Sequence, residues 1–433
     1  MENKILEKAQ GFYFLAIGIL MYYFLTEIIN LGIFVAFRHA FALVLFFSAF
    51  LCFLIKPNVA RGLTATKSAL VYSLPLIVTI AASLFIWFVE LVDTEVISRG
   101  LSGAFVYTNM ISFSLAAAAF LYVFGEKGIW YNLIAILCAN LMMIFTIIAQ
   151  NGIGVYFSEF ITLITTFAGV TGDVIVQAEI HELAFCVGAY LIYMALKPRK
   201  SIAFYILLAL SLFCFLSAFK RIGIIAIAAA LFFVFVLKLV AKMNKKTAFA
   251  LTTILSILLV VILVIYIFLI KIDIFSVLEE MGIETSGRVD IYHAVDKFYE
   301  FSPDFLGNGI GFLTYQLSNS DVGVSAVHND FLQYFIDLGF WGYILWLLSM
   351  TVARVIYFGR RGQVDNGIIS FVLTVYLVII SSTDNTMNYP LLTTVLAILM
   401  IGHGFDDKVR TTEEKMFGYI SEPNQKKEGE SLL

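Results

Sequence analysis

The chain has 433 residues, of which 61% are hydrophobic and 14% charged, and its mean hydropathy is +0.93. These polar groups are too few to cover the surface of a soluble protein. The composition therefore excludes a soluble enzyme and predicts an all-α, polytopic membrane protein. The net charge of −3 says little about partners, because in a membrane protein the positions of Lys and Arg matter more, and we expect no nucleic acid to bind. The four cysteines lie in apolar runs without metal-ligand spacing and are interpreted as packing residues.

Apolar runs that are long enough for tilted membrane helices recur along the whole chain. They predict about twelve spans, at residues 11–28, 39–55, 69–89, 103–124, 129–149, 181–196, 201–217, 222–241, 248–270, 332–353, 367–382 and 391–405. If the N-terminus is cytoplasmic, the inner segments hold 21 of the 28 Lys and Arg residues, as the positive-inside rule requires. We therefore expect both termini in the cytoplasm.

The predicted spans divide the chain into four parts. Residues 1–270 carry nine spans, residues 271–331 form one large external loop, residues 332–405 carry three spans, and residues 406–433 form a cytoplasmic tail. The composition of the loop is not that of a disordered segment, so it should fold, whereas the tail has no periodic apolar face and should be solvated. Between residues 151 and 180 the chain is apolar enough to lie in the membrane interface or to enter the membrane as a hairpin.

Helical periodicity begins in the external loop at Gly287. Apolar positions recur at helical spacing and predict one packed face, whereas the charged positions between them should face water. Pro303 should end this helix, and the glycines after it should make a tight turn rather than a dinucleotide site, which needs a strand-turn-helix setting. The apolar positions are Ile291, Tyr292, Val295, Phe298 and Tyr299, the charged positions are Asp290, Lys297 and Glu300, and the glycines are Gly307, Gly309 and Gly311.

Two arginines lie at predicted outer positions between apolar runs. Arg288 follows Gly287 in the loop, and Lys220 and Arg221 lie in a tight connection between two spans. A guanidinium stays charged and offers a planar fork of donors to two phosphate oxygens, so both arginines are candidates for binding a diphosphate. The alternative for each arginine is snorkelling to lipid headgroups.

His328 lies just ahead of the next span, where the N–H groups of a helix N-terminus disfavour an imidazolium. A neutral imidazole can accept a proton from a sugar hydroxyl, so His328 is the candidate general base. Asn329, Asp330 and Gln333 add hydrogen-bonding groups that suit sugar hydroxyls. The alternatives are a capping or core histidine followed by plain helix caps.

Three weaker patterns contain further candidates. His181 and Glu182 open a span from the outer side, where an interfacial polar cap is the favoured interpretation and sugar contacts come second. Asp384 occupies the outer end of another span, where turn chemistry competes with a role in orienting the substrate or an arginine. Asp93 and Glu95 have a spacing that can hold a divalent cation, but such pairs are common in proteins, so we do not expect a metal there. We also expect no cofactor.

Taken in order, the loop and histidine elements resemble the O-antigen ligase and polymerase superfamily of bacterial membrane glycosyltransferases. That family carries a Gly-Arg element in a large external loop, a downstream Gly-x-Gly turn and a His-Asn-x-x-Leu-Gln element. Here the elements read Gly287-Arg288, Gly307-Asn308-Gly309-Ile310-Gly311 and His328-Asn329-Asp330-Phe331-Leu332-Gln333. The resemblance covers about residues 210–345, and Lys220 departs from the small residue that is common ahead of the family's other arginine.

The resemblance implies a GT-C-like helical bundle in the bacterial plasma membrane, a polyprenyl-diphosphate-linked oligosaccharide donor and no metal. It also implies that Arg221 and Arg288 bind the diphosphate and that His328 is the loop histidine, with a flippase and a chain-length regulator as candidate partner proteins. We expect a polymerase that joins lipid-linked repeat units on the outer face. The alternatives are a ligase that transfers a finished glycan to a terminal acceptor and a lipid-linked oligosaccharide flippase, whose spans should carry polar residues along a path.

Overall fold

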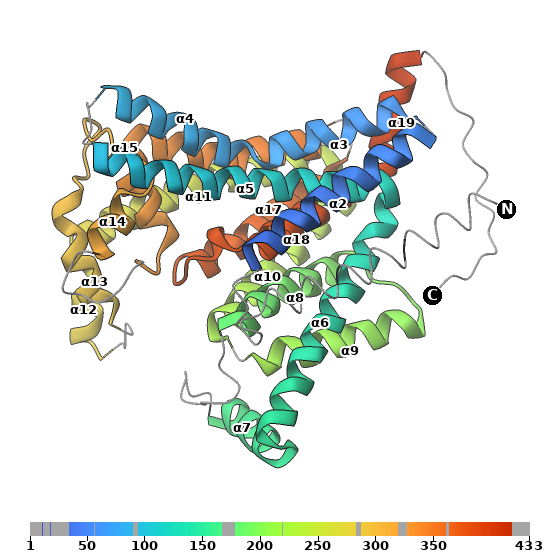
Figure 1. Cartoon of the computed structure of the whole chain (residues 1–433), viewed down its shortest axis with the longest axis horizontal. Coiled ribbons are helices and arrows are strands. Elements are labelled where there is room, and N and C mark those ends of the chain that lie inside the picture. The colour runs from blue at the N-terminus through green and yellow to red at the C-terminus, as the bar shows by residue number, and fades with distance from the viewer. Residues whose placement is uncertain are drawn as a thin grey trace. The chain divides into compact units, whose positions relative to one another are not determined.

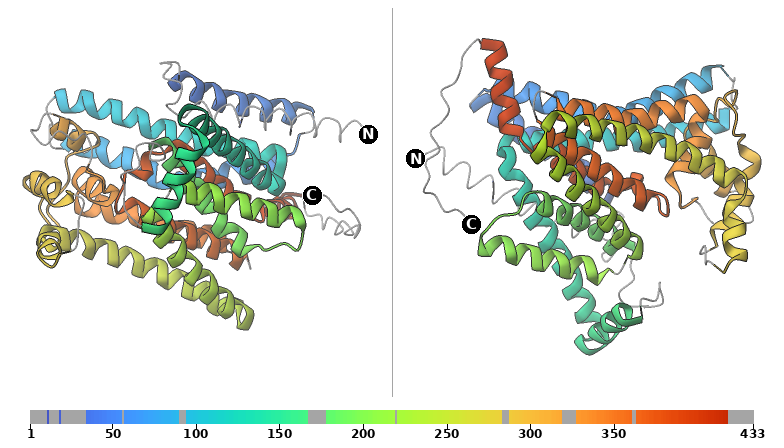
Figure 2. Two further views of the ribbon diagram at one scale, coloured as in Figure 1. Left: turned by 90° about the horizontal axis from the view of Figure 1, so that it is seen from below. Right: turned by 180° about the vertical axis from the view of Figure 1, so that it is seen from behind.

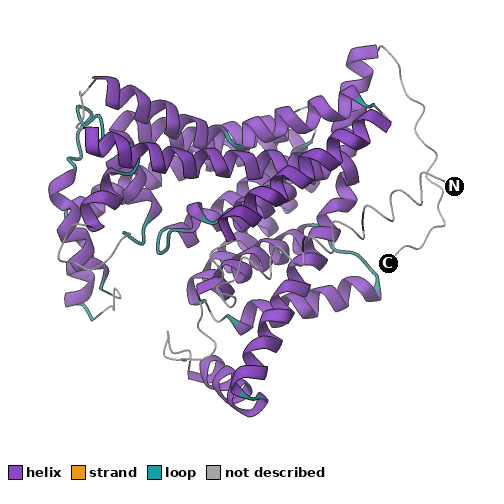
Figure 3. Cartoon of the chain, in the orientation of Figure 1, coloured by secondary structure: helices purple, strands orange, loops and turns teal. Residues whose placement is uncertain are grey.

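The computed structural model describes residues 34–55, 57–89, 94–166, 178–218, 220–282, 287–318, 327–360 and 363–417, together with Gly11 and Gly18. Within these ranges every regular element is helical, and Figure 3 shows helices joined by loops, without a strand. The all-α prediction is therefore confirmed for the described residues.

The described helices, most of which are labelled in Figure 1, fall into two compact units. Each unit collects segments that are far apart in the sequence. The first contains residues 1–70, 113–234 and 390–433, and the second contains residues 71–112 and 235–389. Helices α5 (Thr94–Phe124) and α10 (Arg221–Met243) each continue from one unit into the other.

In the first unit the central helix is α8 (Ala178–Leu196), which packs against α6, α9 and α18. Every residue from Leu183 to Met194 is buried, which is typical of a helix that is surrounded by others on all sides. The other elements of this unit are α2 (Phe34–Ile55), most of α3 (Val59–Tyr72), η1 (Gly125–Lys127), α6 (Gly128–Asn151), α7 (Ile153–Thr166), α9 (Ile202–Ser217), α18 (Pro390–Gly402) and α19 (Phe405–Phe417).

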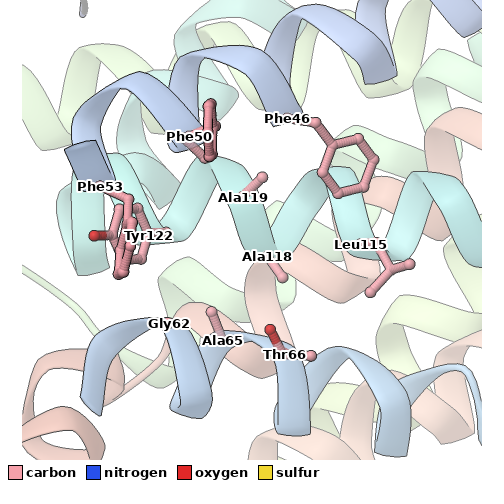
Figure 4. Close-up of a pocket in the computed structure, with 11 residues that line it drawn as sticks. Phe46, Phe50, Phe53, Gly62, Ala65, Thr66, Leu115, Ala118, Ala119 and Tyr122 are labelled. Carbon is pink, nitrogen blue, oxygen red and sulfur yellow. The ribbon is translucent and has the colours of Figure 1, made fainter. Parts of the chain in front are cut away.

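An apolar groove of about 220 Å³ lies between α2, α3 and α5 in this unit (Figure 4). Phe46, Phe50 and Phe53 form an aromatic wall on α2, and small residues of α3 and α5 leave the space opposite them. The lining residues that the structure describes carry no charge, so the groove offers no cation for holding an anion. The small residues are Gly62, Ala65, Ala118 and Ala119.

In the second unit α15 (Asp330–Leu348) packs against α4 (Leu74–Val89) and α11 (Lys245–Lys271), and α17 (Val364–Ser381) packs against α11 and α16. Helix α17 is buried on almost all sides, so it forms the core of this unit. The other elements are α12 (Ile274–Glu280), α13 (Arg288–Val295), η2 (Asp296–Phe298), α14 (Phe312–Ser318), the π-helical turn η3 (Ser349–Ala353), α16 (Arg354–Gly359) and η4 (Thr386–Asn388).

Helix α15 is interrupted at Gly339, where φ is 69° and ψ is −176°. The interruption leaves the carbonyls of Ile336 and Asp337 without their usual partners in the helix. They accept hydrogen bonds from the N–H groups of Asn308 (3.1 Å) and Gly309 (2.7 Å), respectively. A Cβ on Gly339 would lie 2.1 Å from the carbonyl carbon of Leu306, so glycine is required for this approach. The predicted turn at residues 307–311 is confirmed, with positive φ at all three glycines, and it is docked on the interrupted helix.

The polar segment between α11 and α15 is folded where it is described, as predicted. Figures 1 and 2 show α12, α13 and α14 gathered at one end of α11 and α15. Lys271, the last residue of α11, donates hydrogen bonds to the Asp296 carboxylate at 2.7 Å and to the Tyr299 carbonyl at 3.0 Å, which ties the segment to that helix end.

The face predicted for this segment is largely confirmed. Ile291, Tyr292, Val295 and Tyr299 are buried and Phe298 is half-buried, whereas Asp290, Lys297 and Glu300 are exposed. The helix is shorter than predicted, because α13 ends at Val295 and continues as the short 3-10 turn η2 before the chain becomes extended.

Five described helical stretches are long and apolar enough to cross a membrane, and the bent pair α3 and α4 provides a sixth. The described residues therefore support a multi-pass membrane protein, but they do not show the predicted count of twelve spans. The runs predicted at 39–55, 181–196, 201–217 and 391–405 form shorter apolar helices, and the run at 11–28 lies outside the described residues apart from Gly11 and Gly18. The five stretches are Met110–Asn151, Arg221–Met243, Lys245–Lys271, Asp330–Gly359 and Val364–Ser381.

The span predicted at 69–89 is interrupted near its start, because α3 ends at Tyr72 and α4 begins at Leu74. Pro75 explains the interruption, since proline lacks an N–H donor and fits only the first turn of a new helix. Arg354 is buried beside the interruption, and its guanidinium donates through Nε, at 3.1 Å, and through Nη2 to the carbonyl of Tyr72. The arginine thus donates to a carbonyl that has no N–H partner within α3, because the helix ends at that residue.

The first part of the predicted C-terminal tail forms α19 instead of a solvated chain. Its side chains dock on α3, with Asn58 donating to Glu413 at 2.9 Å and the hydroxyls of Thr64 and Thr412 lying 3.0 Å apart. These partners are more than 300 residues away in the sequence, so the pattern of the tail itself does not indicate them. Residues 418–433 lie outside the described residues.

Candidate functional site

Arg288 is the first residue of α13 and follows Gly287 directly. The φ of Gly287 is 73°, a value that L side chains rarely adopt, so the Gly-Arg pair fixes where the helix begins. The side chain of Arg288 is half-buried, and its Nη2 donates a hydrogen bond to the carbonyl of Thr383, 3.0 Å away. This contact fixes the orientation of the guanidinium fork.

His328 has a left-handed backbone conformation with a φ of 53°. Its neighbours Val327 and Asn329 are 1% and 0% exposed, whereas the side chain of His328 is 50% exposed. Strained non-glycine residues of this kind cost about 1–3 kcal/mol and cluster at functional sites. A buried backbone therefore presents this histidine at the surface of the unit.

Arg288 and His328 meet at residues 382–389, the segment after α17, which we call the anchor loop. Thr383 of this loop accepts the hydrogen bond from Arg288, and Oδ1 of Asp384 lies 3.9 Å from Nδ1 of His328. The structure thus brings together three of the predicted site residues from segments about 40 and 56 residues apart in the sequence.

Asp384 is itself held in place within the anchor loop. Its side chain is 17% exposed, and Oδ1 accepts hydrogen bonds from the N–H of Asn385 at 2.8 Å and from the hydroxyl of Tyr389 at 3.3 Å. The first contact is the turn chemistry considered from the sequence, whereas the 3.9 Å separation from His328 is an ion-pair distance that the sequence did not indicate. A fixed carboxylate beside an imidazole can hold the ring in one orientation.

Asn329 is buried behind the site and hydrogen-bonds to the protein instead of forming the surface of the site. It is fully buried, its Oδ1 caps α15 at the N–H of Leu332 (3.2 Å), and its Nδ2 donates to the hydroxyls of Tyr266 (2.8 Å) and Tyr292 (3.0 Å). Burial raises the pKa of Tyr292 against the opposing effects of Asn329 and Arg288, so the phenol is neutral. Asn329 therefore corresponds to the capping interpretation rather than to a sugar ligand.

Two other candidates also make contacts within the protein. Gln333 is half-buried, and its side chain hydrogen-bonds to the carboxylate of Asp337. Glu182 accepts a hydrogen bond from the N–H of Leu391 at 2.9 Å and so caps the start of α18, which is the polar-cap interpretation. His181 belongs to α8, and its side chain lies outside the described part of the structure.

Lys220 and Arg221 lie in the first unit, at the start of α10. The Lys220 carbonyl accepts hydrogen bonds from the N–H groups of Gly223 and Ile224, and Arg221 is exposed. A helix N-terminus carries a partial positive charge, to which these two cations add. This end of α10 is therefore suited to binding a phosphate.

A metal site is not formed by the described side chains. Among them, no group of three or more His, Cys, Asp or Glu residues is arranged to hold a metal ion. Asp93 lies outside the described residues, as does the side chain of Glu95, so the structure does not describe this pair.

Sequence patterns do not identify the groups that hold the site together. The Thr383 carbonyl carries no sequence signal, because every residue has one. Tyr266 lies near the end of an apolar run, where tyrosine is typical of an interface anchor, so its contact with Asn329 is not indicated.

The family model described as O-antigen ligase matches residues 183–347, which confirms for this part of the chain the family predicted from the motifs. This range contains Arg221, Arg288 and His328 and ends before Asp384. Members of the family are membrane glycosyltransferases, and the family implies lipid-linked glycan substrates. No curated protein matches the chain.

Proposed function

Because the chain is a multi-pass membrane protein with an O-antigen ligase domain, we propose that it polymerises polyprenyl-diphosphate-linked oligosaccharide repeat units into a surface polysaccharide. The observation that supports this proposal best is the meeting of His328, Asp384 and Arg288 around the anchor loop. A base, its orienting carboxylate and a phosphate-binding cation are the groups that glycosyl transfer from a diphosphate requires.

In the proposed reaction His328 accepts the proton of an acceptor sugar hydroxyl, and that oxygen attacks the anomeric carbon of the donor. The new glycosidic bond forms as the bond from the anomeric carbon to the diphosphate oxygen breaks, and the polyprenyl diphosphate leaves with the electron pair. Arg288 neutralises the charge that develops on the leaving group, and Asp384 stabilises the imidazolium until the proton passes to water. Arg221 binds the same diphosphate in this proposal.

The proposal includes the topology expected from the sequence, with twelve spans, cytoplasmic termini and the segment 271–331 on the outer face. Three buried ionisable residues of the described spans, Asp330, Asp337 and Arg354, hydrogen-bond to backbone groups of neighbouring segments. Such contacts favour structural roles over a transport path, which supports an enzyme over a flippase.

The test is His328→Ala in a strain that assembles the glycan. The polymer should be lost, and single lipid-linked units should accumulate on the outer face, because the histidine acts after the donor has reached that side. A ligase would instead leave full-length polymer on its lipid, and a flippase would leave units trapped inside.

His293→Ala is the matched control. His293 is 54% exposed in the same polar segment, and its Nε2 lies 3.0 Å from Asp273, so it contacts that residue instead of the anchor loop. This variant should make polymer of normal length. Normal polymer from His328→Ala would refute the assignment of the base.

A second test concerns the metal independence of the proposed reaction. With arginines holding the diphosphate, transfer by the purified protein should continue in EDTA at a rate close to that of the untreated protein. Loss of transfer on chelation, with recovery on adding a divalent cation, would contradict this part of the proposal.

A further inference from the structure

Asp330, two residues after His328, is a buried carboxylate that has no role in the proposed chemistry. It is 0% exposed, and its Oδ2 accepts a hydrogen bond from the N–H of Met387 at 2.9 Å. The N–H of Thr386 and the hydroxyl of Ser381 contact the same carboxylate, and its charged neighbour is a second acid, Asp384. Hydrogen-bond donors on and beside the anchor loop therefore stabilise Asp330.

The Asp330 side chain caps the start of a helical turn that lies 57 residues away in the sequence. Thr386 and Met387 begin the short turn η4, and the N–H groups at the start of a helical turn carry a partial positive charge without an internal partner. A buried acid needs such donors, and the donors need such an acceptor, so the contact holds η4 against the first turn of α15. Neither group can move away without leaving the other unsatisfied.

The anchor loop carries both groups that orient the proposed catalytic residues. Asp384 lies 3.9 Å from His328, and Thr383 lies 3.0 Å from Arg288, each within four residues of Met387. His328 itself belongs to the segment that enters α15. The position of the anchor loop relative to the start of α15 therefore sets both distances.

We propose that Asp330 is a positioning residue, which holds the anchor loop so that Asp384 faces His328 and the Thr383 carbonyl faces Arg288. It contacts no substrate, because it is fully buried. The effect on rate rests on the proposed function, whereas the anchoring of the loop does not.

Asp337 provides a matched control on the same helix. It is 1% exposed, lies two turns after Asp330, and its carboxylate accepts a hydrogen bond from the N–H of Leu313 in α14. It therefore caps a different short helix in the same way, away from the anchor loop. Asp330→Ala and Asp337→Ala each remove a buried cap, and Asp337→Ala also removes the hydrogen bond to Gln333.

The first measurement is amide hydrogen exchange on the purified full-length protein. Asp330→Ala should raise exchange in residues 382–389 and leave residues 307–313 close to wild type, whereas Asp337→Ala should do the reverse. Asp330→Asn should restore much of the protection in the anchor loop, because its amide oxygen still accepts from Met387. Unchanged exchange in residues 382–389 of Asp330→Ala would overturn the proposal.

The second measurement is transfer rate per folded protein with the donor concentration varied. Asp330→Ala should lower kcat by about 10- to 100-fold, as loss of a residue that orients a ligating group does, with KM for the donor changed by less than about threefold. Asp330→Asn should lie between Asp330→Ala and wild type, and Asp337→Ala should keep kcat within about threefold. Equal losses of kcat in Asp330→Ala and Asp337→Ala would show general destabilisation and overturn the positioning role.

The two proposals fail differently. If the wild-type protein transfers no lipid-linked unit, the proposed function is wrong, while the exchange pattern still decides whether Asp330 anchors the loop. If wild type transfers and Asp330→Ala does so at an equal rate, the proposed function stands and the positioning role is wrong.

Discussion

At the scale of single residues, the position of His328 is determined by its neighbours more than by its own contacts. Val327 is buried, and Asn329 uses its amide on two tyrosine hydroxyls and on the first turn of α15. Between two such fixed points the backbone of His328 takes a left-handed conformation, and the imidazole projects toward Asp384. The cost of the strain, about 1–3 kcal/mol, is offset by the burial on both sides.

Arg288 gives a prediction at the same scale. Arg288→Ala should reduce transfer by roughly 10² to 10³, by analogy with the loss of one transition-state donor. Arg288→Lys should be almost as impaired, because lysine keeps the charge but cannot donate to Thr383 and to two phosphate oxygens with one planar group. Initial rates on detergent-purified protein, normalised to folded protein, measure the effect. Near-normal transfer by the lysine variant would show that charge alone is required.

At the scale of elements, acidic side chains cap the starts of helices that come from other parts of the chain. Asp330 caps η4, Asp337 caps α14, and Glu182 caps α18. The oxygens of the acid accept hydrogen bonds from N–H groups that have no partner inside their own helix. For η4 and α14, which have three and seven residues, such contacts show how very short helices are held in place.

The interruption of α15 at Gly339 makes a second prediction. Gly339→Ala places a Cβ about 2 Å from the backbone of Leu306 at a positive φ, so the glycine turn must move away from α15. Destabilisation by more than about 3 kcal/mol is expected, which is typical when backbone meets backbone. Gly154→Ala in α7 is the control, since a Cβ there meets nothing within 4 Å. Thermal unfolding in one detergent compares the two, and equal melting temperatures would contradict the requirement for glycine.

The contact between α12 and α13 should depend on pH. Burial raises the pKa of Asp273, but the Ser276 hydroxyl and His293 together lower it further, so the pKa lies below the ordinary value of 3.8. A carboxylate with a lowered pKa stabilises the fold above its unfolded pKa, about 3.9, and this contribution is lost as the pH falls through the folded value. The two side chains are about half exposed, so the effect is local.

Hydrogen exchange can test this dependence through the protection factors of residues 274–280. Protection should persist from neutral pH to about pH 4 and fall below it. Asp273→Asn, which tolerates the left-handed backbone at this position, should have lower protection at neutral pH and little further change in acid. The same acid-dependent loss in that variant would assign the effect to other groups.

The sequence predicts the parts of the site that are local. Glycine at 287 and at 307, 309 and 311 indicates the turns, and the apolar spacing after Gly287 indicates which face of α13 is buried. The position of the anchor loop is not predictable in this way, because Asp330 and Met387 are 57 residues apart. The residues around Asp330 are equally compatible with an ordinary helix cap, and those around Met387 with an ordinary turn. Asp384 was identifiable as a candidate from its place at the end of an apolar run, but its pairing with His328 is a property of the fold.

At the scale of the whole molecule, hydropathy predicts well which segments are apolar helices, but it predicts poorly whether each segment forms one uninterrupted helix. Pro75 divides one predicted span, and the docking of α19 on α3 adds structure to a segment that has no apolar periodicity. Runs of 10–17 residues form helices whose length alone does not establish a crossing. Counting apolar residues therefore identifies a multi-pass membrane protein, while the number of crossings depends on how the short helices combine.

Arg221 and Arg288 belong to different units, so their functional coupling is a question about the whole molecule. If both bind one diphosphate, each single alanine variant disrupts the same interaction, and the double variant should lose less than the two single losses combined on a logarithmic scale. The quantity to measure is kcat/KM for the lipid-linked donor in wild type, both single variants and the double variant. Arg410→Ala, an exposed arginine that pairs with Asp407 in α19, is the control and should combine additively with Arg288→Ala. Strict additivity for Arg221 and Arg288 would place the two arginines in separate sites and remove Arg221 from the proposed mechanism.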